Sequence, residues 1–106
     1  TLIELIKYLL ELEKYTTIIL NKPSLESVIS NIQSQEPEFV LIDVHMKDAN
    51  GLDILKRIRE SNFSFQPKVL MWSGVPMKDE CIDAGADAFL LKPFNPDDLI
   101  GWLRAR

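Results

Sequence analysis

Short apolar runs alternate along this 106-residue chain with segments whose apolar residues recur every three or four positions. The clearest run, Phe39 to Ile42, is continuously apolar, stops at Asp43 and lies between two segments of helical periodicity. Such a run is typical of a strand that is buried on both faces, as strands of parallel sheets are. The alternation therefore predicts a doubly wound α/β domain with a parallel sheet, right-handed crossovers and helices on both faces.

The periodicity predicts five helices and four strands, and the order begins with a helix. Ser24 is placed to cap the second helix, Gly85 to end the fourth, and Asn95 or Pro96 to cap the last. The predicted helices span 1–12, 25–35, 52–60, 77–84 and 97–104, and the predicted strands span 15–20, 39–42, 68–72 and 88–91. Because a sheet of this kind normally opens with a strand, we expect that a strand preceding residue 1 is missing from the sequence given.

Composition excludes several classes of protein. The length and a hydrophobic fraction of 46% suit one globular domain, and no apolar run approaches the roughly 20 residues of a membrane-spanning helix. The single cysteine, Cys81, permits no disulfide within the chain, which favours a cytoplasmic location. The net charge of −4 disfavours direct contact with nucleic acid, because the nearest basic cluster, Lys56, Arg57 and Arg59, is flanked by Glu60.

Three polar residues each follow an apolar strand: Asp43, Ser73 and Lys92. Taken singly, the aspartate is explained as a cap, the serine as a partner for a loop amide and the lysine as a surface residue. Because ligands of open α/β sheets bind at the carboxyl ends of the strands, the three side chains are expected to converge. A carboxylate, a hydroxyl and an ammonium group in one place are suited to accepting a phosphoryl group.

The sequence resembles the receiver domains of two-component response regulators. The resemblance rests on FVLIDVHM at 39–46, NGLDIL at 50–55, WSG at 72–74 and GADAFLLKPF at 85–94, and it extends over nearly the whole chain. It implies a flavodoxin-like fold of three layers, helix/sheet/helix, with residues 1–106 forming one receiver domain that is incomplete at its N-terminus.

The resemblance also implies a role for each matching residue. Asp43 is the expected phosphoacceptor, Ser73 the hydroxyl that follows the phosphoryl group, and Lys92 the cation that pairs with Asp43 or its phosphate. Gly74 keeps access to the site open. Pro93 matches a proline that the family holds in a cis peptide, which aims the lysine ammonium into the site.

Two further positions carry a role in the family. Phe89 matches the aromatic switch position, although an ordinary core phenylalanine explains it nearly as well. The main-chain carbonyl of His45 matches a ligand of Mg²⁺, together with Asp43. The other ligands in the family are an acidic pair after the first strand, and we expect these upstream of Thr1.

Two functions remain open at this point. If the acidic pair exists, the chain is the phosphoacceptor domain of a phosphorelay, with Mg²⁺ as cofactor and a sensor histidine kinase or phosphotransfer protein as partner. If the pair is absent, the chain is a pseudo-receiver that acts in protein–protein contact or dimerisation. The missing strand normally lies between the strands at 15–20 and 39–42, so the fragment is expected to be unstable, rearranged or completed by a strand of a partner, including a second copy.

Overall fold

A computed structural model of the chain describes residues 2–20, 24–46 and 49–105. It divides into two compact units, a helical unit of Thr1–Leu20 with Pro93–Arg106 and a sheet unit of Asn21–Lys92. The helical unit contains α1 (Leu2–Leu12) and α5 (Pro96–Arg104). The sheet unit contains α2 (Leu25–Gln35), β1 (Phe39–Asp43), α3 (Gly51–Glu60), β2 (Lys68–Ser73), α4 (Lys78–Asp83) and β3 (Ala88–Leu91).

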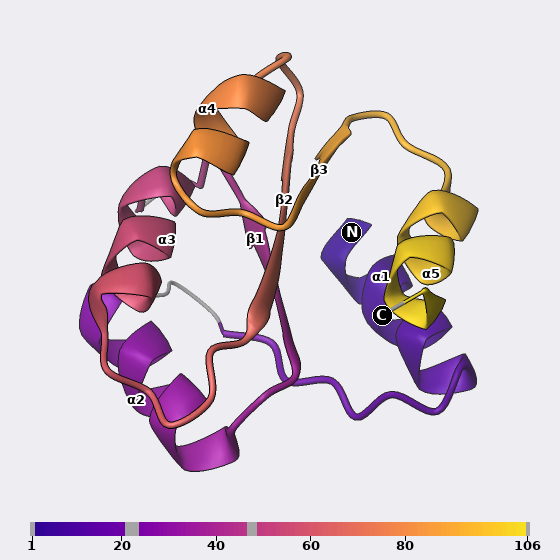
Figure 1. Ribbon diagram of the computed structural model, residues 1–106. Coiled ribbons are helices and arrows are strands. Elements are labelled where there is room, and N and C mark those ends of the chain that lie inside the picture. The colour runs from indigo at the N-terminus through magenta and orange to yellow at the C-terminus, as the bar shows by residue number, and fades with distance from the viewer. Residues whose placement is uncertain (1, 21–23, 47–48, 106) are drawn as a thin grey trace. The chain divides into compact units, whose positions relative to one another are not determined.

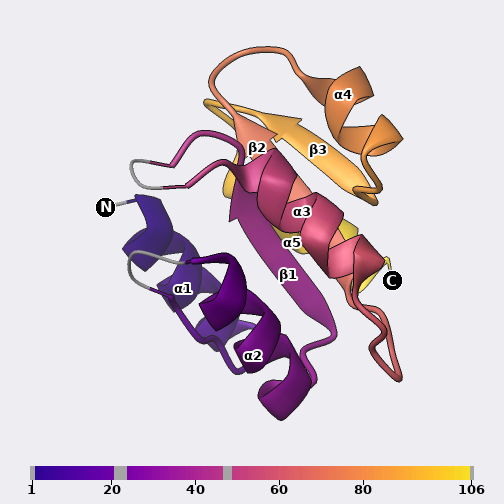
Figure 2. The same ribbon diagram turned by 90° about the vertical axis from the view of Figure 1, so that its left-hand side faces the viewer.

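The sheet unit is built on three parallel strands in the order β1-β2-β3. The register places Asp43 beside Trp72 and Ser73 beside Leu91, so all three strands end at the same edge of the sheet. Helices α2, α3 and α4 lie over one face of these strands (Figure 1), and they lie next to one another in front of the sheet in the perpendicular view (Figure 2). This arrangement is that of parallel strands joined by helical crossovers.

The helices of the sheet unit begin and end where their local chemistry requires. Ser24 caps α2 as predicted, and it forms a reciprocal pair with Ser27, in which each side chain accepts the other residue's backbone N–H. Glu36 ends α2 in the left-handed conformation with φ of 47°. Asn50 caps α3 by accepting the N–H of Leu52.

The core of the sheet unit is centred on β2. Five of its six residues are buried, and only Lys68 at its start is exposed. One face of α3 completes this core with Ile54, Leu55 and Ile58, all at most 2% exposed. At about 25 cal/mol per Å² of apolar surface removed from water, burying such side chains is the main stabilising contribution to the unit.

The prediction that the strand at 39–42 is buried on both faces is wrong. In β1 only Ile42 is buried, and Phe39, Val40, Leu41 and Asp43 are half-buried. The reason is that, within the described residues, β1 pairs with β2 alone and is an edge strand. The side chains of an edge strand have fewer neighbours to cover them.

The predicted strand at 15–20 is also wrong. These residues follow α1 without forming any regular element, and no sheet ladder includes them. Their β-branched and aromatic composition favours a strand only when a neighbouring strand supplies the hydrogen bonds of a ladder. Among the residues that the structure describes, no strand occupies the position that was expected between 15–20 and β1.

The end of α3 is fixed by an extended set of hydrogen bonds from Arg59. Its guanidinium donates to the carbonyls of Gly85 and Pro67, each at 2.9 Å, and pairs with Asp87 Oδ2 at 3.0 Å. The same Asp87 oxygen accepts the N–H of Val69 at 2.8 Å. Arg59 therefore joins α3 to the start of β2 and to the loop before β3. These contacts lie at the amino ends of the strands, whereas Asp43 lies at the carboxyl end of β1.

In the helical unit, α5 begins at Pro96, one residue before its predicted start, and Asn95 is its cap, one of the two caps that were predicted. The Asn95 side chain accepts the N–H of Asp97, and Pro96 occupies the first turn, where its missing N–H costs nothing. An ion pair joins Arg104 of α5 to Glu13 just after α1. No helix in the described part of the chain is long and apolar enough to cross a membrane.

Candidate functional site

An ion pair joins Asp43 to Lys92 at the carboxyl edge of the sheet. Asp43 is the last residue of β1, and Lys92 directly follows β3. The Lys92 ammonium donates to Asp43 Oδ2 at 2.7 Å, and the two side chains are 30% and 21% exposed. The pair is therefore sheltered from solvent but still accessible, which strengthens the attraction relative to a fully exposed pair.

The second oxygen of Asp43 is bound by the chain that follows it. Oδ1 accepts the N–H of His45 at 3.1 Å, while the N–H of Val44 donates to the carbonyl of Trp72 at 2.9 Å. These bonds fix the turn after β1 and orient the carboxylate. The His45 side chain is exposed. The backbone of His45 pairs with that of Asn50 in an isolated antiparallel β-bridge.

Ser73 lies at the same edge, as the last residue of β2, and is completely buried. Its Oγ accepts the N–H of Val75 at 3.1 Å and lies 4.0 Å from the sulfur of Met77. Its carbonyl accepts the backbone N–H of Lys92 at 2.8 Å. This bond connects the backbone that carries the lysine to the strand that carries the serine, so the structure brings Asp43, Ser73 and Lys92 to one edge.

Gly74, Phe89 and Pro93 are the remaining residues that the sequence predicts at the site. Gly74 is exposed, and a methyl group added there would meet no atom within 4 Å, so the space beside Ser73 is open. Phe89 is half-buried in β3, beside Met71 in the register. Pro93 is assigned to the helical unit, and its role at the site stays a prediction.

Sequence reasoning missed the contact that Gly51 makes with Asp43. A Cβ at position 51 would overlap the carbonyl oxygen of Asp43 and lie 2.9 Å from Cα of Val44. The N–H of Gly51 donates to the carbonyl of Val44 at 2.9 Å. The start of α3 therefore packs directly against the backbone of Asp43, and only glycine permits this approach. The Asn-Gly pair at the start of α3 was the available signal.

The oxygen donors near Asp43 suit a hard cation. Mg²⁺ is held in proteins by one or two carboxylates together with water and substrate phosphate. Asp43 supplies one carboxylate, and the carbonyl of His45 is the second predicted donor. Among the described residues, no group of three or more histidine, cysteine or acidic side chains is gathered as a metal site. The donors present therefore fit Mg²⁺ in kind, and the expected acidic pair is not among them.

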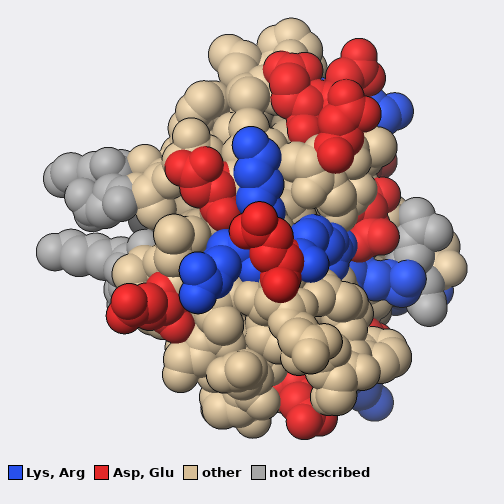
Figure 3. Space-filling view, turned by 60° about the vertical axis from the view of Figure 1, so that its left-hand side comes forward, with Lys and Arg blue, Asp and Glu red and all other residues tan. Residues whose placement is uncertain are grey.

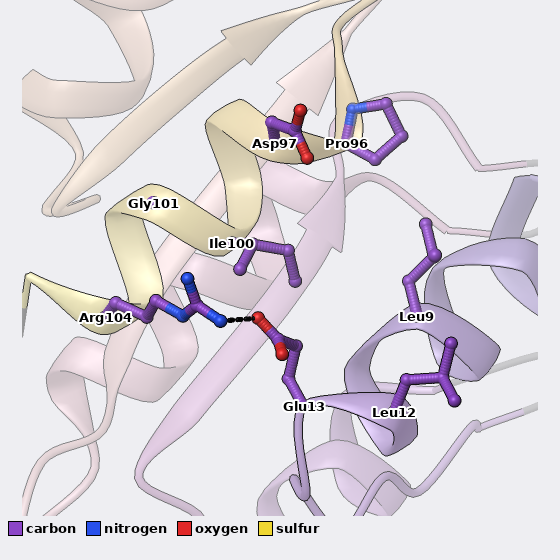
Figure 4. Close-up of a pocket in the computed structure, with 8 residues that line it drawn as sticks. All are labelled: Leu9, Leu12, Glu13, Pro96, Asp97, Ile100, Gly101 and Arg104. Atoms are coloured by element: carbon purple, nitrogen blue, oxygen red, sulfur yellow. Dashed lines mark hydrogen bonds and ion pairs between the residues drawn. The ribbon is translucent and has the colours of Figure 1, made fainter.

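A surface hollow lies elsewhere, between the two helices of the helical unit. Figure 4 shows Leu9 and Leu12 of α1 facing Ile100 of α5, with the Glu13–Arg104 ion pair beside them. None of the predicted site residues lines it. The hollow therefore belongs to the packing of α1 against α5 rather than to the Asp43 site.

The surface over α3 and α4 carries both signs of charge. Figure 3 shows lysine and arginine side chains interspersed with aspartate and glutamate on this face. Within the predicted basic cluster, Lys56 and Arg57 are exposed, whereas Arg59 is bound to Asp87 and to backbone carbonyls. The cluster therefore presents fewer accessible cations than the sequence suggests.

A parallel α/β sheet with a paired aspartate and lysine at its carboxyl edge matches the architecture expected of a receiver. The chain matches the family model described as "Response regulator receiver domain" over residues 1–104. It therefore belongs to this family, which serves two-component signalling.

Curated relatives support the same assignment. The chain is 29% identical over 98 residues to the nitrate/nitrite response regulator NarL of Escherichia coli K12, covering 90% of this chain and 44% of NarL. It is 33% identical over 98 residues to a nitrate/nitrite response regulator homologue of Haemophilus influenzae, covering 90% of this chain and 46% of that protein. The chain thus spans less than half the length of these relatives.

Solved receiver structures share the fold. The receiver domain of a response regulator from Bermanella marisrubri is 26% identical and superposes with a TM-score of 0.85, covering 96% of this chain and 85% of that chain. The receiver domain of the Francisella response regulator 1452 is 25% identical, with a TM-score of 0.81, covering 96% of this chain and 84% of that chain. The predicted class, an α/β receiver fold with a parallel sheet, is confirmed.

Proposed function

We propose that the chain is the phosphoacceptor domain of a two-component phosphorelay and that Asp43 is the residue phosphorylated. The ion pair of Asp43 with Lys92 carries this proposal. It places a cation within hydrogen-bond distance of the carboxylate that would attack phosphorus. The ammonium is then already positioned beside the phosphoryl group when that group is transferred.

The donor is the phosphohistidine of a sensor histidine kinase or a phosphotransfer protein. A carboxylate oxygen of Asp43 attacks phosphorus, the new P–O bond forms as the P–N bond breaks, and the imidazole of the donor leaves. Lys92 stabilises the charge on the phosphoryl oxygens in a loose transition state, and the Ser73 hydroxyl follows the transferred group. Asp43 and the His45 carbonyl would hold Mg²⁺, which when bound supplies neutralisation of phosphate charge. The open space at Gly74 admits the donor.

The transferred group changes the surface through Ser73 and Phe89. A phosphoryl group adds about −1.5 to −2 charge at neutral pH, and it shifts an equilibrium only through contacts that differ between two states. A Ser73 hydroxyl that turns toward the phosphate gives up its present bond to the Val75 N–H. Phe89 would then move inward, and the altered surface would act on an output domain or partner.

The wider setting follows from this role. We propose that residues 1–106 are the receiver part of a longer cytoplasmic regulator, with acidic ligands of Mg²⁺ upstream of Thr1. Its partners are the kinase or phosphotransfer protein and, in addition, a second copy. The mixture of charges over α3 and α4 supports the proposal that this part makes no direct contact with nucleic acid.

Two observations on the described residues favour the alternative of a pseudo-receiver. There β1 pairs with β2 alone, and no group of three or more histidine, cysteine or acidic side chains is gathered to hold a metal ion. In that case Asp43 and Lys92 form a structural ion pair, and the domain acts by binding or dimerisation through its unpaired strand edge.

Acetyl phosphate distinguishes the two functions. The intact mass of the protein is measured after incubation with acetyl phosphate, in Mg²⁺ and in a chelator, for the native chain and for Asp43→Asn. A Mg²⁺-dependent phosphoryl adduct that Asp43→Asn abolishes supports the phosphoacceptor. A folded protein that gains no adduct supports the pseudo-receiver instead.

A further inference from the structure

The Asn50–Gly51 peptide link contains the groups needed for spontaneous deamidation. The chain has asparagines at 21, 31, 50, 62 and 95, and only Asn50 is followed by glycine. Glycine leaves its own backbone nitrogen unshielded, because it has no side chain, and lets that nitrogen approach the preceding side-chain amide. Asn50 is exposed, so solvent water has access to this amide.

Two hydrogen bonds hold both reacting groups away from the reaction. The N–H of Gly51, whose nitrogen would be the nucleophile, donates to the carbonyl of Val44 at 2.9 Å. The side-chain oxygen of Asn50, whose Cγ would be attacked, accepts the N–H of Leu52 at 2.9 Å as the cap of α3. The Gly51 nitrogen is thus held toward the carbonyl of Val44, and the Asn50 side-chain amide is held toward the first turn of α3.

The close packing of Gly51 adds a third restraint. Its Cα lies so near the backbone of Asp43 and Val44 that no Cβ fits, so the start of α3 cannot swing without moving the end of β1. The reaction requires Gly51 to release Val44 and turn toward the Asn50 side chain. That movement must open the junction between β1 and α3.

We propose that Asn50–Gly51 is a deamidation site that the fold protects and that reacts when the junction between β1 and α3 opens. The Gly51 nitrogen loses its proton to solvent base and attacks Cγ of Asn50, a C–N bond forms, and ammonia leaves to give a cyclic imide. Water then opens the imide at either carbonyl, which yields aspartate or isoaspartate at position 50. No oxidant or cofactor enters the balance.

This inference is independent of phosphorylation, since it concerns the backbone chemistry of residues 50 and 51. It does bear on the candidate site, because isoaspartate lengthens the main chain by one methylene directly before Gly51. The added length falls where the helix contacts the backbone of Asp43. The normal aspartate product keeps the backbone unchanged and retains a side chain that caps helices.

The test compares the folded protein with the same protein unfolded in urea, at the same mildly alkaline pH and temperature. Peptide mapping by mass spectrometry follows conversion at Asn50, with Asn31 and Asn62 as internal references. We expect conversion in the folded protein to be slower by about tenfold or more, because the cap and the Gly51 bond must both open. The Asn50→Ser variant keeps a capping side chain but no amide, and it should show no conversion at this position.

Two outcomes overturn the proposal. Equal rates at Asn50 in the folded and unfolded protein would mean that the junction does not protect the site. Conversion in urea no faster at Asn50 than at Asn31 or Asn62 would mean that the Asn-Gly link is not especially reactive. Far-ultraviolet circular dichroism on the folded samples ensures that the comparison is made between a folded and an unfolded chain.

Discussion

Lys92 donates a 2.7 Å hydrogen bond to Oδ2 of Asp43 across the end of β2. Asp43 ends β1, Lys92 follows β3, and β2 lies between those strands in the sheet. The lysine reaches the aspartate because its backbone N–H is bound to the carbonyl of Ser73 at the end of β2. Three consecutive strands of the sheet therefore supply one compact polar site.

Replacing Lys92 should affect phosphorylation far more than stability. The pair is partly exposed, so Lys92→Ala should change the free energy of unfolding by no more than about 1 kcal/mol. Loss of the positioned cation should slow labelling of Asp43 by acetyl phosphate by about tenfold or more. Initial labelling rates and urea unfolding measure the two effects, with Lys56→Ala on the exposed side of α3 as the control. Equal labelling of both variants would remove Lys92 from the mechanism.

Gly51 and Gly101 form a matched pair for testing the close contact at Asp43. Gly51→Ala should lower the free energy of unfolding by about 1–3 kcal/mol, because its Cβ would overlap the Asp43 carbonyl and the backbone must shift. Gly101→Ala, inside α5 with no atom within 4 Å of the new Cβ, should raise it by about 0.5–1 kcal/mol. Urea unfolding of both variants checks the sign. A neutral Gly51→Ala would show that the junction is loosely packed.

Arg59 should contribute more to stability than its neighbour Arg57. Arg59→Ala removes the bonds to Gly85, Pro67 and Asp87 and leaves part-buried carbonyls without that donor, so we expect a loss of about 1–3 kcal/mol. Arg57→Ala changes an exposed side chain on the same helix and should cost less than about 0.5 kcal/mol. Thermal unfolding of the two variants compares them. Similar losses of stability in the two variants would mean that the Arg59 hydrogen bonds stabilise the fold no more than an exposed arginine on the same helix does.

Cys81 should be inert in the folded protein. Burial, and in second place the Glu80 carboxylate, raise the pKa of its thiol above 9.0. Folding therefore favours the neutral thiol. The contribution of the buried thiol to the free energy of unfolding is complete below pH 9, and it is lost as the pH rises through the raised pKa of the folded state. Alkylation by iodoacetamide at pH 8 should be slow in buffer and fast in urea. Rapid alkylation in buffer would contradict the buried position.

Much of the sheet unit could be predicted from the sequence, because the spacing of its apolar residues matches the face that each helix or strand buries in the core. The predicted helix at 25–35 and strand at 88–91 coincide with α2 and β3, and β2 differs from its prediction by one residue. The strand at 15–20 failed because a strand exists only with a partner, and composition alone does not provide one.

The site was predictable in part for a similar reason. Asp43, Ser73 and Lys92 each stand at the end of an apolar run. Because parallel strands point in the same direction, residues at their carboxyl ends lie at the same end of the sheet. The Asn-Gly pair marks the start of α3, but the packing of Gly51 against the Asp43 backbone depends on the angle at which α3 leaves the turn, which the sequence does not specify. The sequence also could not show that the Ser73 hydroxyl binds the Val75 N–H, which is a bond of the folded loop.

The position of the phosphoryl group tests the central claim most directly. The protein is incubated with acetyl phosphate and Mg²⁺, digested rapidly at low temperature and mapped by tandem mass spectrometry. The account predicts one phosphorylated site at Asp43 and no label in a chelator. A folded protein labelled at another residue, or not labelled at all, would contradict it.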